Sequence, residues 1–211
     1  MKRQTKTLNL TLMSLLFAMI WIMAFTPVGY IKAGAVEITV IHIPVIIGAI
    51  MGGPVAGLVL GTAFGFSSFV QAFGLSPFGV ALMSINPLYT FILMVIPRAL
   101  MGWLVGLIFK ALNKVDKTKI VSFAVTSLSA ALLNTVLFMS TLVLLFYNTG
   151  YIQEFVAASG ASNVFAFVVV FVGINGLIEA VVCTVLGTAI SKPLYVLKSR
   201  LEGRQKTAEN K

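Results

Sequence analysis

Two ionisable side chains, Arg98 and Glu179, lie within long apolar stretches of the sequence. An ionisable group inside a bilayer costs about 2.5–3.5 kcal/mol on insertion scales, so such groups usually face other helices and have a partner. Arg98 precedes Lys110 by 12 residues and Glu179 precedes Lys192 by 13, which places both at a similar depth. We therefore expect them either to form an ion pair between two helices or to take part in a ligand site.

Uncharged polar residues gather at or above this level, and together they predict a polar cavity that opens outward between the loops 26–37, 73–86 and 147–163. Asn175 lies one helical turn from Glu179 and hence on the same helix face. Singly, each residue suits a hydrogen bond between helices. Besides Ser67, Ser68 and Gln71, which share this level, we select as candidate ligand-binding residues His42, Asn86, Tyr89, Arg98, Asn134, Asn175 and Glu179.

Several kinds of chemistry are not supported by the residues present. A single histidine and a single cysteine, Cys183, far apart in the sequence, make a metal cluster or a Cys-His nucleophile improbable, so we expect no enzyme, no catalytic residue and no cofactor. The G-x-x-x-x-G-K-[ST] phosphate loop is absent, so energy for any transport must come from a partner or a gradient. The net charge of +9 sits beside apolar segments, which indicates membrane topology and not nucleic-acid binding.

These polar residues must be positioned by helices that cross a membrane. The chain has 211 residues, of which 59% are hydrophobic and 10% charged, and no charge lies between Glu37 and Arg98 or between Lys119 and Glu154. About 20 apolar residues suffice to span a bilayer. Gly52-Gly53-Pro54 and Asn86-Pro87 mark helix starts. We predict one all-α domain with spans near 8–25, 38–52, 54–72, 87–109, 120–146 and 164–190, and a basic tail at 192–211.

The basic residues fix the orientation that we predict. With six spans, the N-terminus, the loop from Lys110 to Lys119 and the C-terminal tail share one side, which then holds every Lys and Arg except Lys32 and Arg98. The positive-inside rule places that side in the cytoplasm. We therefore expect a multi-pass protein of the cell membrane with both ends cytoplasmic.

Small residues recur at four-residue spacing in three of these spans. Gly53, Gly57, Gly61 and Gly65 lie on one face of the third span, and Gly102 and Gly106 repeat the pattern in the fourth. Such stripes let helix backbones approach closely, so we interpret them as packing faces within the chain, with a face for a partner protein as the alternative. Ser14 and Ala18 form a similar pair in the first span.

The sequence resembles the substrate-binding S components of energy-coupling factor (ECF) vitamin transporters. The resemblance rests on Thr26-Pro27-Val28-Gly29-Tyr30-Ile31, on the block from Ile38 to Ala49 that contains His42-Ile43-Pro44-Val45, on Gly53-Pro54 with the glycine stripe, and on Ile96-Pro97-Arg98. It implies a subunit that binds a vitamin near the outer face, associates with a membrane scaffold subunit and two cytoplasmic ATPases, and topples to release the vitamin inside. The family's Ala-xxx-Ala docking motif corresponds to Ser14 and Ala18 here, with serine in place of the first alanine.

Within that family the chain looks most similar to pantothenate-specific members. Pantothenate is a carboxylate with hydroxyl and amide groups, which suits an arginine, a histidine and asparagines. If Glu179 neutralises Arg98, the carboxylate of pantothenate would instead be bound by Lys32 or by a helix N-terminus. Riboflavin or a pyridoxine-like ligand, stacked on Phe64, Phe66 or Tyr89, is an alternative, and an autonomous secondary transporter that uses Glu179 is another.

Overall fold

The computed structural model describes residues 2–33, 36–116 and 120–209, and within these ranges the protein is almost entirely helical. Five helices are long and apolar enough to cross a membrane, and a sixth crossing is possible if a bent helix pair counts as one span. The prediction of a polytopic helical membrane protein is thus confirmed. The elements are α1 (Lys2–Ala24), η1 (Pro27–Gly29), β1 (Tyr30–Ala33), β2 (Val36–Thr39), α2 (His42–Gln71), α3 (Pro77–Ile85), α4 (Pro87–Val115), α5 (Val121–Phe146), α6 (Gly150–Ser159) and α7 (Val164–Glu209).

Helix α2 is folded back on itself at Gly53. That residue has φ 79° and ψ −170°, a conformation that glycine adopts without strain, and Pro54 starts the second half. A side-chain carbon built on Gly48 would meet Leu60, 12 residues later, although 12 residues of straight helix span about 18 Å. Residues 42–52 and 54–71 therefore lie side by side, whereas that these two halves cross the membrane separately stays a prediction.

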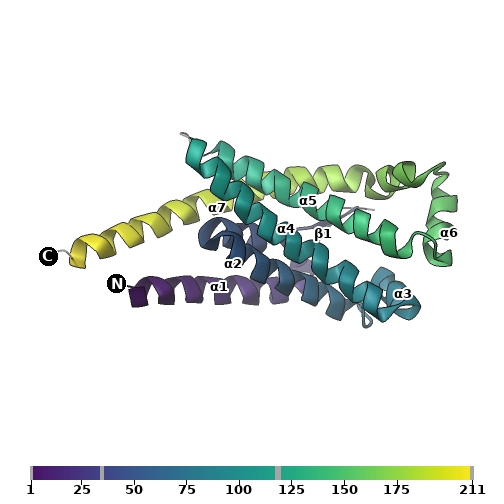
Figure 1. Cartoon of the computed structure of the whole chain (residues 1–211), viewed down its shortest axis with the longest axis horizontal. Helices are drawn as coiled ribbons and strands as arrows, with labels where there is room; N and C mark the ends of the chain where they lie inside the picture. The colour runs from purple at the N-terminus through teal and green to yellow at the C-terminus, as the bar shows by residue number, and fades with distance from the viewer. Residues whose placement is uncertain (1, 34–35, 117–119, 210–211) are drawn as a thin grey trace.

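The long segments run up and down one bundle (Figure 1), and both ends of the chain lie at the same end of it. This agrees with an even number of passes. That the shared end faces the cytoplasm remains a prediction, and Lys117 and Lys119 of the basic loop lie outside the described residues.

The glycine stripe of α2 packs against α4 at backbone distance. A side-chain carbon on Gly57 would overlap the carbonyl of Gly102, and one on Gly61 would overlap the carbonyl of Arg98. At Gly65 the carbon would lie 2.7 Å from the carbonyl oxygen of Met94. Glycine is therefore required along this seam because nothing larger fits between the backbones.

Several boundaries differ from the prediction. The second span was predicted to begin at residue 38, but α2 begins four residues later, at His42. Residues 36–39 are instead strand β2, which pairs antiparallel with β1 so that Tyr30 lies opposite Thr39. The predicted loops 73–86 and 147–163 contain the short helices α3 and α6. Helix α3 begins after a residue that suits a helix start: Ser76 accepts a hydrogen bond from the Gly79 amide, and Pro77 follows at the first helical position.

The predicted last span, 164–190, is shifted towards the C-terminus. Helix α7 breaks at Gly173, where φ is 48° and ψ is −148°, and the part suited to cross a membrane is Asn175–Leu201. The segment before the break forms, with α6, a pair bent by 79°. The helix then continues to Glu209, through most of the predicted basic tail, and Leu194 and Tyr195 pack against the core beyond Lys192.

Candidate functional site

A cavity of about 240 Å³ lies among β2, α2, α4, α5 and α7. It draws on five elements that are distant in sequence, so it depends on the whole bundle. Its lining is polar on several sides and aromatic on others: Thr39, His42, Phe64, Ser68, Arg98, Asn134, Thr135, Phe138, Met139, Phe171, Val172, Asn175, Gly176 and Glu179.

The structure brings together five of the seven residues selected as ligand-binding from sequence: His42, Arg98, Asn134, Asn175 and Glu179 all line the cavity. The other two selected residues do not belong to its lining. Asn86 caps α4, where its side-chain oxygen accepts a hydrogen bond from the Tyr89 amide over 3.1 Å. The Tyr89 ring is 40% exposed and packs edge-on against Phe146. The side chain of Lys32, the second candidate for a carboxylate, lies outside the described part of the chain.

His42 is fixed by two acceptors on the same ring nitrogen. Its Nδ1 lies 3.2 Å from the carbonyl oxygen of Thr39 and 3.3 Å from Glu179 Oε1. Both partners accept hydrogen bonds, so Nδ1 carries a proton, and in the tautomer that has its proton there the Nε2 lone pair is an acceptor. Because the imidazole is 1% exposed and the ring of Phe64 packs against it, 5.2 Å between centroids, its orientation is well determined.

The position of Arg98 follows from the proline before it. Pro97 has no N–H, so it cannot donate the helical hydrogen bond to the carbonyl of Leu93, four residues earlier. Arg98 Nη1 donates to that carbonyl instead, over 2.9 Å. The guanidinium carbon also lies 4.3 Å from the centroid of Phe138 and 5.7 Å from that of Phe64, within the range of cation–π attraction. Because of Pro97, the side chain of Arg98 lies back along its own helix, and it forms part of the cavity lining.

Glu179, for which an ion pair with Arg98 was one of two expectations, lies with its Oε1 against Nδ1 of His42. Its side chain is 17% exposed, and it forms part of the lining together with Arg98. The cavity therefore carries a guanidinium on one wall and a carboxylate beside an imidazole on another. A ligand with a negative group at one end and hydrogen-bond donors at the other matches this arrangement.

Among the buried polar atoms of the lining, two that can accept a hydrogen bond have no hydrogen-bond partner within the ranges that the structure describes. They are His42 Nε2 and Asn134 Oδ1. A buried acceptor without a partner costs about 1–3 kcal/mol, so both atoms favour a ligand that donates hydrogen bonds. Both atoms belong to residues that were selected from the sequence. Asn134 Oδ1 is an amide oxygen, and His42 Nε2 is an acceptor when the ring has its proton on Nδ1 alone.

Sequence reasoning missed several lining residues, among them Thr135, Phe138, Met139, Phe171 and Val172. For those on α5 a signal existed, because Thr135 follows Asn134 directly and Phe138 is one turn further along the same face. Phe171 and Val172 carry no comparable signal, since their placement depends on the break at Gly173. Phe64 and Ser68 were recognised in the sequence and do line the cavity, whereas Phe66 is 45% exposed and packs near Trp21.

The candidate partner-binding residues lie on the outside of the bundle. Ser14 and Ala18 are both exposed on α1, whereas Leu16, Ile20 and Ala24 of the same helix are buried in the core. α1 is the least buried of the candidate spans, with 17% of its apolar window inside the protein. The small pair therefore faces away from the chain, where another helix could approach its backbone.

Comparison with known protein families gives one match, which extends over most of the chain. Residues 8–191 match the family described as ECF transporter, substrate-specific component. No curated protein matches the chain. The matched segment includes the cavity lining from Thr39 to Glu179 and the exposed pair on α1. The chain therefore belongs to the family of ECF transporter substrate-specific components, integral membrane subunits that bind the transported substrate.

Proposed function

We propose that the chain captures pantothenate in the 240 Å³ cavity for uptake driven by an ECF scaffold subunit and two cytoplasmic ATPases. The observation that carries the substrate assignment is Arg98, which the carbonyl of Leu93 holds within the cavity lining. An arginine in this position suits a carboxylate, because the guanidinium fork can donate two parallel hydrogen bonds to it.

The remaining groups of pantothenate find complementary chemistry in the lining. His42 Nε2 and Asn134 Oδ1 are acceptors for the two hydroxyls or the amide N–H, and Asn175 offers both a donor and an acceptor. Phe138 and Met139 provide apolar contact for the branched methyl groups. The guanidinium of Arg98 is a positively charged group of the lining, and the carboxylate of Glu179 lies at His42.

A compact ligand is favoured over a large aromatic one. Small-molecule pockets usually have volumes of about 300–1,000 Å³, so a cavity of about 240 Å³ is at the small end. The ring of Phe138 already packs on Arg98 and the ring of Phe64 on His42, which leaves few aromatic faces for a flavin to stack on. Pyridoxine, which is small but carries no carboxylate, remains the alternative vitamin.

Calorimetry on the purified chain alone tests this proposal. We expect pantothenate to bind at one to one, with no binding of riboflavin, thiamin or pyridoxine at matched concentrations. Pantothenol, in which a hydroxymethyl group replaces the carboxylate, should bind more weakly. No heat with any of the four vitamins, or preferential binding of an uncharged one, would contradict the assignment. Gradient-driven flux through liposomes that hold the chain alone would instead indicate a secondary transporter.

Docking on the scaffold is expected to depend on the small pair of α1. In Ala18→Trp the large ring would hold a partner helix away, so uptake by cells that express the whole transporter should fall to background. Binding of pantothenate to the purified variant should be unchanged, because Ala18 is exposed and outside the cavity. The matched control is Ala111→Trp, at an exposed position of α4. Normal uptake by Ala18→Trp would remove the assignment of this face.

A further inference from the structure

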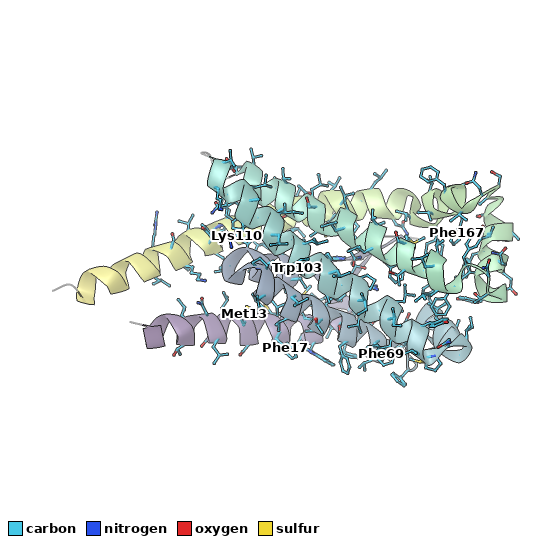
Figure 2. The ribbon with its side chains drawn as sticks, viewed as in Figure 1. Met13, Phe17, Phe69, Trp103, Lys110 and Phe167 are labelled. Carbon is cyan, nitrogen blue, oxygen red and sulfur yellow. The ribbon has the colours of Figure 1, made fainter. Side chains whose placement is uncertain are left out.

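A second cavity, of about 400 Å³, lies beside the fold in α2. It is formed by residues 49–54 of α2, the last turns of α4 and the stretch from Tyr195 to Ser199 of α7. Lys110 marks its position in Figure 2, at the end of the bundle that holds both chain ends. Since Lys110 is the first charged residue after the apolar span of α4, this cavity lies at the level where lipid head groups begin.

The lining of this cavity is strongly positive. It includes Lys110, Lys114 and Lys198, and no acidic residue is among its lining residues within the described ranges. Lys198 has a structural role as well, because its Nζ donates over 2.7 Å to the carbonyl of Met51, in the last turn before the break at Gly53. The long side chain therefore joins α7 to the fold in α2 and places an ammonium at the cavity wall.

An uncharged acceptor lies among these lysines. Asn113 donates from Nδ2 to the hydroxyl of Tyr195 over 3.3 Å, and its Oδ1 is buried without a hydrogen-bond partner in the described part of the chain. Phosphate oxygens cannot satisfy an acceptor, whereas a hydroxyl can. Tyr195 and Ser199 add two further hydroxyls to the lining. The polar half of the cavity thus suits a group that combines a negative charge with hydroxyl donors.

The other half of the cavity is apolar. Ala49, Ile50 and Phe109 line it and are almost fully buried, and Met51 and Pro54 complete this part. A free sugar phosphate or polyol phosphate would gain nothing from such a surface. The glycerol esters and first methylenes of a lipid would be removed from water there.

We propose that this cavity binds the head group of an anionic phospholipid that carries hydroxyls, with its phosphate on Lys110 and Lys114 and a head-group hydroxyl on Asn113 Oδ1. Phosphatidylglycerol has this chemistry. The bound lipid would join α2, α4 and α7 at the fold of α2, at a site separate from the cavity that contains Arg98.

Native mass spectrometry of the full chain, released from an uncharged detergent with added lipid, tests the proposal. We expect phosphatidylglycerol to be retained at one per chain and phosphatidylcholine not to be. The double variant Lys110→Gln with Lys114→Gln should bind phosphatidylglycerol about 30-fold more weakly, since each basic residue contributes about 1 kcal/mol. The control double variant Lys192→Gln with Arg200→Gln removes the same charge from α7 outside this cavity and should bind normally.

A second variant separates the head group from charge alone. Asn113→Leu should lose the preference for phosphatidylglycerol over phosphatidic acid, which lacks the glycerol hydroxyls, while it still retains anionic lipid. Equal retention of phosphatidylcholine, an equal loss in the control double variant, or an unchanged preference in Asn113→Leu would overturn the proposal. Displacement of the lipid by soluble glycerol 3-phosphate at equal concentration would show a soluble phosphate site instead.

Discussion

Gly61→Val is expected to lower the melting temperature of the purified protein by about 6–12 °C. The added side chain would overlap the backbone carbonyl of Arg98 on the facing helix, and a backbone cannot rotate away as a side chain can. Overpacking typically costs about 1–3 kcal/mol, and we expect the upper end of that range here. A loss of 1 kcal/mol corresponds to about 2–4 °C for a protein of this size. Thermal unfolding followed by tryptophan fluorescence measures the shift.

The same substitution should weaken ligand binding, because separating α2 from α4 at this position displaces Arg98 itself. Gly150→Val is the matched control, since no other atom lies within 4 Å of the added carbon and the residue begins the exposed helix α6. Gly61→Ala should give an intermediate shift. Equal melting temperatures for Gly61→Val and Gly150→Val would show that α2 and α4 are not packed at backbone distance.

The sequence determines the depth of a residue more reliably than its direction around a helix. Counting from Lys110 and from Lys192 placed Arg98 and Glu179 at one level, and both do line one cavity. Which side chain Glu179 meets depends on how α7 is rotated against α2, and that rotation results from packing across the bundle. The side chain that the Glu179 carboxylate meets is His42, 137 positions away in the sequence.

Local rules explain what could be predicted about the backbone. Gly53-Pro54 and Asn86-Pro87 mark real boundaries, because a positive φ and a missing N–H act on the residue itself. The antiparallel pairing of residues 30–33 with 36–39 and the break at Gly173 had no such unique signal. A glycine in a long apolar run is as compatible with a continuous helix as with a bend, and only the surrounding structure selects between them.

Asn86 and Tyr89 show the limit of residue type as a guide to a site. Asparagine and tyrosine near an outer helix end suit a ligand, but they suit a helix cap and the membrane interface equally well. The N-cap geometry of Asn86 uses its side-chain oxygen at the start of α4. Phe138, by contrast, was overlooked as an ordinary apolar residue, although its ring supports the guanidinium of Arg98.

Arg98→Leu is expected to reduce the affinity for pantothenate by about 10- to 150-fold, as measured by calorimetry on the purified chain. Hydrogen bonds to charged groups contribute about 1.5–3 kcal/mol, and the variant removes the only guanidinium in the cavity lining within the described ranges. Affinity for pantothenol, which lacks the carboxylate, should change little. Arg98→Lys should retain part of the affinity, because an ammonium keeps the charge but not the fork that matches a carboxylate.

Two comparisons make this result specific to the carboxylate. Arg200→Leu removes an arginine from the exposed C-terminal part of α7, outside this cavity, and should bind both ligands normally. If Arg98→Leu lost pantothenate and pantothenol to the same extent, the arginine would act through packing on Phe138 and Leu93 and not through the ligand's charge. Unchanged affinity for pantothenate would place the carboxylate elsewhere. A selective loss for the acid is therefore the outcome that assigns Arg98 to its recognition.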